Sequence, residues 1–137
     1  MALFTLEIDG NPVPKGRPRF TRTGRVFTPS KTFAYEQSGK HLAREIWKDQ
    51  DLITTPISCS VVVKMPIPKS WPRKKRAAAE ENTLHHTSRP DLDNFIKIAL
   101  DILNGTVISD DSIVVSLSGE KIYSVAPSLL VRIEQKS

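Results

Sequence analysis

The sequence predicts an α+β fold, a small two-layer domain in which two helices cover one face of a mixed sheet in the order β-α-β-α-β-β. Three segments alternate apolar and polar residues with the period of two that is typical of half-buried strands, and a fourth is rich in β-branched residues. Two other segments repeat apolar residues at three- and four-residue spacing, which indicates amphipathic helices. We expect residues 1–137 to form one domain, since this length buries enough surface without disulfides.

The N-terminal half contains a strand, a basic loop and a helix. Residues 3–8 alternate, and Gly10 and Pro12 end the strand. Residues 15–25 read KGRPRFTRTGR, with five basic residues and no acidic one, and glycine and proline favour an irregular arm. A helix is expected from about Pro29 to about Asp49, because proline suits a first helical turn and an apolar stripe follows it.

The C-terminal half begins with a strand at residues 57–65, which Pro66 and Pro68 end. Residues 66–88 form the longest irregular stretch, with room for a short helical turn at residues 77–81, and connections this long are more often functional than structural. The second helix is expected at residues 93–104, where Asn104 and Gly105 form a helix stop. The last two strands are expected at 112–123 and 129–133.

The composition favours a basic cytoplasmic protein. The net charge of +5 and the isoelectric point near 9.5 are compatible with nucleic acid as a partner, although many basic proteins bind none. The single Cys59 lies in a strand-like run and is expected to be a buried, reduced thiol. No segment resembles a signal peptide or a membrane span, so no membrane partner is expected.

Five carboxylates interrupt this positive charge within a short stretch of the chain. They are Asp91, Asp93, Asp101, Asp110 and Asp111. A cluster of carboxylates repels a polyanion unless divalent cations lie between the two, so the combination predicts metal-dependent chemistry on a phosphodiester. Hard cations such as Mg²⁺ prefer oxygen ligands, and two or three carboxylates suffice.

Each aspartate also has an ordinary structural explanation. Asp91 and Asp93 can cap the second helix or complement its dipole, but as a pair in an extended segment they can straddle a cation. Asp110 and Asp111 can form a solvated turn at a strand entrance. The metal hypothesis therefore requires that the helix N-terminus and that strand entrance meet.

Other polar residues around this motif have open roles. Lys97 lies four residues from both Asp93 and Asp101, a spacing that fits either ordinary ion pairs or a cation that orients the scissile phosphate. Asp101 is expected to be a surface partner of Lys97. His85 and His86 are candidate metal ligands or a general base, although solvated or phosphate-contacting histidines are the more frequent case.

Two basic segments and one arginine are the predicted DNA contacts, with Phe20, Phe27 and Trp71 available for stacking. The basic residues are Lys15, Arg17, Arg19, Arg22, Arg25, Lys69, Arg73, Lys74, Lys75, Arg76 and Arg89.

These motifs together resemble the RusA family of Holliday junction resolvases. The resemblance rests on the run RPDLDNFIK at residues 89–97, on LDILNG at 100–105 and on SDDSIV at 109–114, and it extends to the GRPRF arm at 16–20. It implies that Asp91, Asp93 and Asp111 are the metal-binding catalytic carboxylates and that Lys97 is the catalytic lysine, with Asp110 as the alternative to Asp111.

The resemblance also implies a function. It points to a homodimer that uses Mg²⁺, or Mn²⁺, and no nucleotide cofactor, and that resolves four-way DNA junctions by symmetric nicks during recombination and repair. Such a protein would be associated with the nucleoid, whether its gene is chromosomal or prophage-derived. A non-catalytic DNA-binding module and a less selective nuclease for branched DNA are the alternatives.

Overall fold

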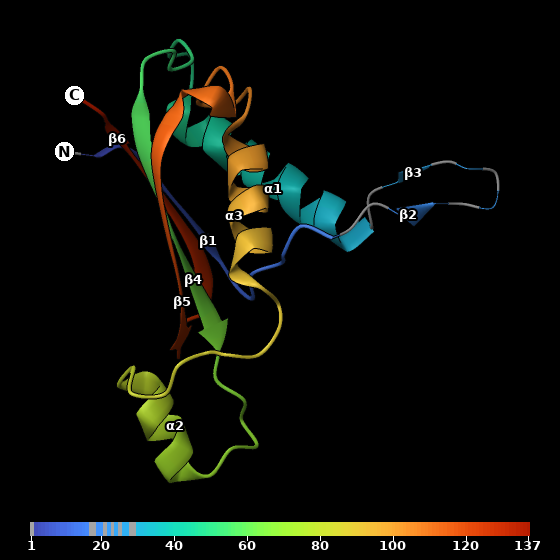
Figure 1. The fold of residues 1–137 in the computed structure, drawn as a ribbon, viewed down its shortest axis with the longest axis vertical. Coiled ribbons are helices and arrows are strands. Elements are labelled where there is room, and N and C mark those ends of the chain that lie inside the picture. Colours follow the sequence, from blue (N-terminus) through green and yellow to red (C-terminus); the bar gives the residue numbers. More distant parts are fainter. Residues whose placement is uncertain (1, 17–18, 21, 23, 25, 28–29) are drawn as a thin grey trace.

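A four-stranded mixed sheet forms one layer of the protein (Figure 1). The computed structural model describes residues 2–16, 19–20, 22, 24, 26–27 and 30–137, and of residues 19, 20, 26 and 27 it describes the backbone alone. The four strands are β1 (Ala2–Asp9), β4 (Ile57–Pro66), β5 (Val114–Ser124) and β6 (Ser128–Gln135), and they lie in the order β1-β6-β4-β5. β6 pairs antiparallel with β1 and β4, whereas β4 and β5 are parallel. The predicted α+β class and mixed sheet are confirmed.

Two long helices cover one face of this sheet, as predicted. They are α1 (Ser30–Trp47) and α3 (Leu92–Leu103). Every second residue of β4 is buried, from Ile57 to Met65, and so are the apolar residues of α3 that the spacing identified. α1 and α3 approach closely at Gly39, where an added Cβ would lie 2.5 Å from Cδ1 of Ile102.

A third helix lies within residues 66–88, where the sequence left room for a short helical turn. α2 (Arg73–Glu80) begins four residues before the expected turn. It is short and mostly exposed, and Ala79 is its buried residue. The basic arm also contains paired backbone, since β2 (Arg19–Phe20) and β3 (Val26–Phe27) form a small antiparallel ladder in a segment expected to be irregular.

The direction of α3 relative to β5 decides where the acidic residues lie. A chain that leaves β4 and returns to a parallel neighbour must cross back over the sheet, so α3 runs opposite to both strands. Ile96 and Leu92 lie against Gly119, and Pro90 lies against Lys121 near the end of β5. The C-terminal end of α3 leads instead to η1 (Asp111–Ile113), a single 3₁₀ turn at the start of β5.

Cys59 is free and buried, and burial raises the pKa of its thiol to about 11, as expected for an unreactive cysteine. Among the described residues, none of the helices combines the length and the apolar character needed to cross a membrane.

Candidate active site

Asp91 and Asp93 lie on either side of the point where α3 begins. Asp91 is the N-cap residue and has extended backbone, with φ −74° and ψ 145°. Its carboxylate accepts no capping hydrogen bond, so simple helix capping does not explain this side chain. Asp93 already belongs to the first helical turn, in agreement with a helix expected from residue 93, so the two aspartates do not share one extended segment.

A shallow surface pocket of about 380 Å³ surrounds Asp91. Its lining consists of Arg89, Pro90, Asp91 and Asn94. One predicted catalytic carboxylate and one predicted DNA contact therefore share a single recess. A phosphate that entered this recess would meet Arg89 as well as the carboxylate of Asp91, and a cation between phosphate and carboxylate would offset the repulsion of the two anions.

Lys97 lies beside the second aspartate. Its Nζ is 3.9 Å from Oδ2 of Asp93, one helical turn away, and both side chains are largely exposed. At that distance and exposure the ion pair contributes little to stability. The ammonium is therefore free to contact an anion next to Asp93, in agreement with the position expected for Lys97 from its spacing.

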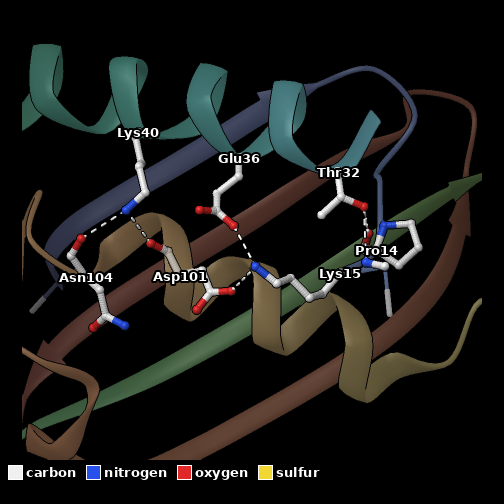
Figure 2. Close-up of polar contacts among 8 residues, drawn as sticks. Pro14, Lys15, Thr32, Glu36, Lys40, Asp101 and Asn104 are labelled. Atoms are coloured by element: carbon white, nitrogen blue, oxygen red, sulfur yellow. Dashed lines mark hydrogen bonds and ion pairs between the residues drawn. The ribbon is translucent and has the colours of Figure 1, made fainter. Parts of the chain in front are cut away.

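Asp101 has a different partner from the one expected. Its Oδ2 lies 2.8 Å from Nζ of Lys15, whereas no ion pair with Lys97 is found among the described residues (Figure 2). Lys15 also lies 3.0 Å from Oε1 of Glu36 in α1. Burial opposes the charge of Lys15, but its hydrogen bonds to Asp101 and Glu36 outweigh burial and raise its pKa. Lys15, predicted to bind DNA, is thus committed to an internal ion-pair network.

This network anchors the base of the basic arm against both long helices. The backbone N–H of Lys15 donates to the carbonyl of Asn94 in the first turn of α3, at 2.9 Å. Thr32 in α1 accepts from the N–H of Gly16 and donates to the carbonyl of Pro14 (Figure 2). The arm therefore leaves the body of the protein next to Asp91 and Asp93.

A second lysine joins the middle of α1 to the C-terminal end of α3. Lys40 of α1 donates to the carbonyls of Asp101 and Asn104, at 2.7 and 3.1 Å (Figure 2). These are carbonyl groups at the C-terminal end of α3, which lack partners within the helix and carry partial negative charge. The direction of α3, and with it the position of Asp91, is fixed at both ends.

Asp110 and Asp111 do not join Asp91 and Asp93 within one chain. They precede Val114 at the start of β5, whereas Asp91 follows Pro90, which contacts Lys121 near the end of this strand. Seven residues separate Val114 from Lys121, or roughly 23 Å at about 3.3 Å per residue. The expectation that the helix N-terminus and the strand entrance meet is therefore not fulfilled in a single chain (Figure 1).

The two downstream aspartates differ from each other. Asp110 accepts a hydrogen bond from the backbone N–H of Ser112 at 3.0 Å and caps η1. That bond lowers the pKa of Asp110. Asp110 thus stabilises the turn at the start of β5, as the structural explanation of this residue predicted. Asp111 is then the better candidate of the two for a metal ligand.

The donor chemistry of the acidic pair fits a hard divalent cation, but the number of donors in one chain is small. In the described parts of the chain, no three side chains of histidine, cysteine, aspartate or glutamate come together as a metal site. His85 and His86 supply no further ligand there. His86 packs against Tyr123, with ring centroids 4.8 Å apart, and burial followed by the charge of Lys121 lowers its pKa.

The second basic segment lies at the end of the sheet toward which the N-terminus of α3 points. α2 exposes Arg73, Lys74, Lys75 and Arg76, and it lies at the end of the sheet from which the chain passes into α3 (Figure 1). Trp71 was expected to be available for stacking on DNA. Instead it packs edge-on against Tyr123 and under the ammonium of Lys75, 4.0 Å from the ring centroid, so it holds α2 to β5.

The remaining predicted contacts are described only in part. Arg22, Lys69 and Arg89 are exposed. Arg17 and Arg25 lie outside the described residues, as do the side chains of Arg19, Phe20 and Phe27. Lys121 was missed at the sequence level, because a lysine in a strand has no local signal of a contact 31 residues away.

A carboxylate that shares a recess with an exposed arginine, near a helix rich in exposed cations, is an arrangement suited to proteins that act on nucleic-acid phosphates. Residues 9–134 match the family model described as Endodeoxyribonuclease RusA. A relative from Bacillus subtilis (strain 168), the uncharacterized protein YqaN, is 38% identical over 142 residues, which cover all of this chain and 99% of the relative. The chain belongs to the RusA family of endodeoxyribonucleases.

Proposed function

We propose that this endodeoxyribonuclease is a homodimer that resolves four-way DNA junctions in recombination and repair, with Mg²⁺ or Mn²⁺ bound by Asp91, Asp93 and Asp111. The observation that carries the proposal is the recess around Asp91. The carboxylate of Asp91 accepts no capping hydrogen bond, and Arg89 lines the same recess. The anchored base of the basic arm contacts the first turn of α3, and the exposed cations of α2 lie at the end of the sheet from which the chain passes into α3. Together they supply the charge that holds DNA arms.

The residues around the recess have separate tasks in phosphodiester hydrolysis. Asp91 and Asp93 hold the cation, which when bound neutralises the scissile phosphate and activates water. Lys97, whose ammonium lies beside Asp93, stabilises the charge that develops on the phosphate oxygens. Arg89 lines the same pocket as Asp91 and orients the phosphate before it reacts.

A second copy of the chain is the proposed source of the missing carboxylate. β5 is the longest strand of the sheet and lies at its edge. Val115 and Leu117 on this strand are 60% and 45% exposed. A long edge strand with exposed apolar side chains favours pairing with another strand. Pairing with its own copy gives a two-fold dimer, which matches a junction that needs two symmetric cuts.

Antiparallel pairing of β5 with its copy would bring the separated aspartates together. A two-fold axis near Leu117 places residue 111 of each copy opposite residue 123 of the other. Tyr123 lies two residues beyond Lys121, whose ammonium contacts the carbonyl of Pro90 next to Asp91. Asp111 of each copy therefore approaches Asp91 and Asp93 of the other, and two equivalent sites form.

Cleavage of defined substrates tests the function. Labelled four-way junction, fork, flap and linear duplex are incubated with the purified protein, with and without Mg²⁺. The proposal predicts paired nicks on the junction that require the metal, 5′-phosphate ends, and at least tenfold slower cleavage of linear duplex. Equal cleavage of forks, flaps and junctions would instead identify a less selective nuclease for branched DNA.

The Asp91→Asn variant identifies the site in the same assay. It should retain junction binding and lose cleavage by about 10³-fold or more, because a neutral amide replaces a metal-binding carboxylate. Asp49→Asn, at an exposed aspartate beyond the end of α1, is the matched control. Unchanged cleavage by Asp91→Asn would contradict the proposed site.

A further inference from the structure

Lys121 makes an unusual contact from the edge strand to the segment that precedes α3. It lies near the end of β5 and is half-buried. Its Nζ donates hydrogen bonds to the carbonyls of Ser88 and Pro90, at 2.7 and 2.8 Å. One ammonium therefore fixes both carbonyls that flank Arg89, and the residue after Pro90 is Asp91.

The surroundings of this ammonium explain why it points at backbone. Burial lowers the pKa of Lys121, and the negative charge of Asp91 opposes that effect. Among the described residues no carboxylate lies close enough to form an ion pair with Lys121. Its donors are directed to carbonyl oxygens, and the carboxylate of Asp91 remains available on the open side of the segment.

Lys121 and Lys97 thus relate to the acidic pair in different ways. Lys97 extends from α3 and meets the carboxylate of Asp93 itself. Lys121 extends from the sheet and meets the main chain next to Asp91. A further constraint comes from the arm, because the N–H of Lys15 donates to the carbonyl of Asn94. The backbone around Asp91 is held from the sheet on one side and from the arm on the other.

We propose that Lys121 is a positioning residue for Asp91: by binding the carbonyls of Ser88 and Pro90 it sets where that carboxylate lies relative to the edge of the sheet. The inference rests on the proposed function in that Asp91 is taken as a metal ligand. Lysine suits this task because three donors radiate from one atom on a long stem, whereas the planar guanidinium of arginine directs its donors along a fixed fork.

Two measurements, on metal-free protein and on Mn²⁺ binding, test the proposal without relying on DNA cleavage. Lys121→Met keeps the length of the stem and removes the donors. In the metal-free protein, amide hydrogen exchange in residues 88–95 should become at least fivefold faster, with exchange in β4 and β6 unchanged. Mn²⁺ binding, followed by electron paramagnetic resonance, should weaken about tenfold, as for other residues that orient metal ligands.

Matched variants separate positioning from a general loss of stability. Lys64→Met removes a half-buried lysine from the neighbouring strand β4 and should leave exchange in residues 88–95 and Mn²⁺ binding unchanged. Lys121→Arg keeps the charge and should recover part of the lost affinity. Lys121→Met should weaken Mn²⁺ binding no further when Asp91→Asn is already present, because both changes act through one ligand.

The failures of the two proposals are distinguishable. Exchange in residues 88–95 that is the same in Lys121→Met and in the unaltered protein would overturn the role of Lys121, whatever the metal does. Additive losses of Mn²⁺ affinity in the double variant would overturn it as well. Unaltered protein that binds no Mn²⁺ would instead contradict the proposed metal site, and the hydrogen exchange would still decide whether Lys121 holds the segment.

Discussion

The ammonium of Lys15 lies 2.8 Å from the carboxylate of Asp101, so a residue at the base of the basic arm is tied to the last turn of α3. Glu36 of α1 shares the same ammonium at 3.0 Å. Three segments that are far apart in the sequence therefore meet at one cation. This arrangement explains how a basic arm can leave the protein at a defined place beside an acidic site.

Replacing Lys15 should destabilise the protein more than an exposed ion pair would. Lys15→Met leaves the carboxylates of Glu36 and Asp101 facing each other without a cation, and we expect a loss of about 1 kcal/mol in the free energy of unfolding. Urea denaturation at neutral pH measures it. Lys64→Met, which breaks a longer contact of 3.4 Å to Glu7, is the control and should lose less than about 0.5 kcal/mol. Equal losses of unfolding free energy in the two variants would show that the Lys15 network stabilises the protein no more than an exposed ion pair does.

The buried thiol of Cys59 should make the fold sensitive to alkali. Its pKa rises from 9.0 in the unfolded chain to about 11 in the folded protein, because burial disfavours the thiolate. Above pH 9 the unfolded chain releases the thiol proton, whereas the folded state still holds it. The stability that the protein has below pH 9 is therefore partly lost as the pH rises towards 11.

The pH dependence of unfolding checks this effect. Between pH 9 and 11 the free energy of unfolding should fall more steeply in the unaltered protein than in Cys59→Ala, by up to about 1.4 kcal/mol per pH unit. Identical slopes would mean that the thiol ionises equally in both states. Ellman's reagent should likewise react with Cys59 only as fast as the protein unfolds.

The exposed cations of α2 should contribute to DNA affinity by neutralising phosphates. The double variant Arg73→Gln/Lys74→Gln should weaken junction binding and reduce the slope of log affinity against log salt by up to about 2, close to one unit for each phosphate that is no longer neutralised. Binding in Ca²⁺ at several salt concentrations measures the slope. Arg44→Gln/Lys48→Gln removes two exposed cations near the end of α1, far from α2, and should change neither value. The same slope for both double variants would exclude α2 from the interface.

The regular elements were predictable because their side chains repeat with a clear period. The alternation around Cys59 identified β4, and the spacing from Phe95 to Leu103 identified α3. α2 was expected only as a short turn at residues 77–81, because its first four residues are all basic and only Ala79 is buried, so the sequence carries no apolar stripe. The short β2–β3 ladder was missed for a related reason, since glycine and proline in the arm indicated an irregular loop.

The candidate site was predictable in its parts but not in its assembly. The acidic cluster around Asp91 was recognised from its local charge and Lys97 from its spacing, and the structure places Asp91 at the N-cap of α3 and Lys97 one turn beyond Asp93. The separation from Asp111 was not foreseen, because it depends on β5 being parallel to β4. A crossover helix between parallel strands points its N-terminus to the strand ends and not to the strand entrance. Strand direction has no signal in residue alternation.

Mixing two inactive variants tests the central claim, that each active site combines Asp91 and Asp93 of one chain with Asp111 of another. Asp91→Asn and Asp111→Asn should each be inactive alone on a four-way junction. Mixed dimers of the two contain one site with both substitutions and one site with neither. The mixture, exchanged under mild denaturant and refolded, should therefore nick one strand of the junction at up to about a quarter of the unaltered rate, since about half of the dimers are mixed and each has one intact site. If all three carboxylates came from a single chain, every site in the mixture would carry a substitution, and a mixture as inactive as its components would contradict the account.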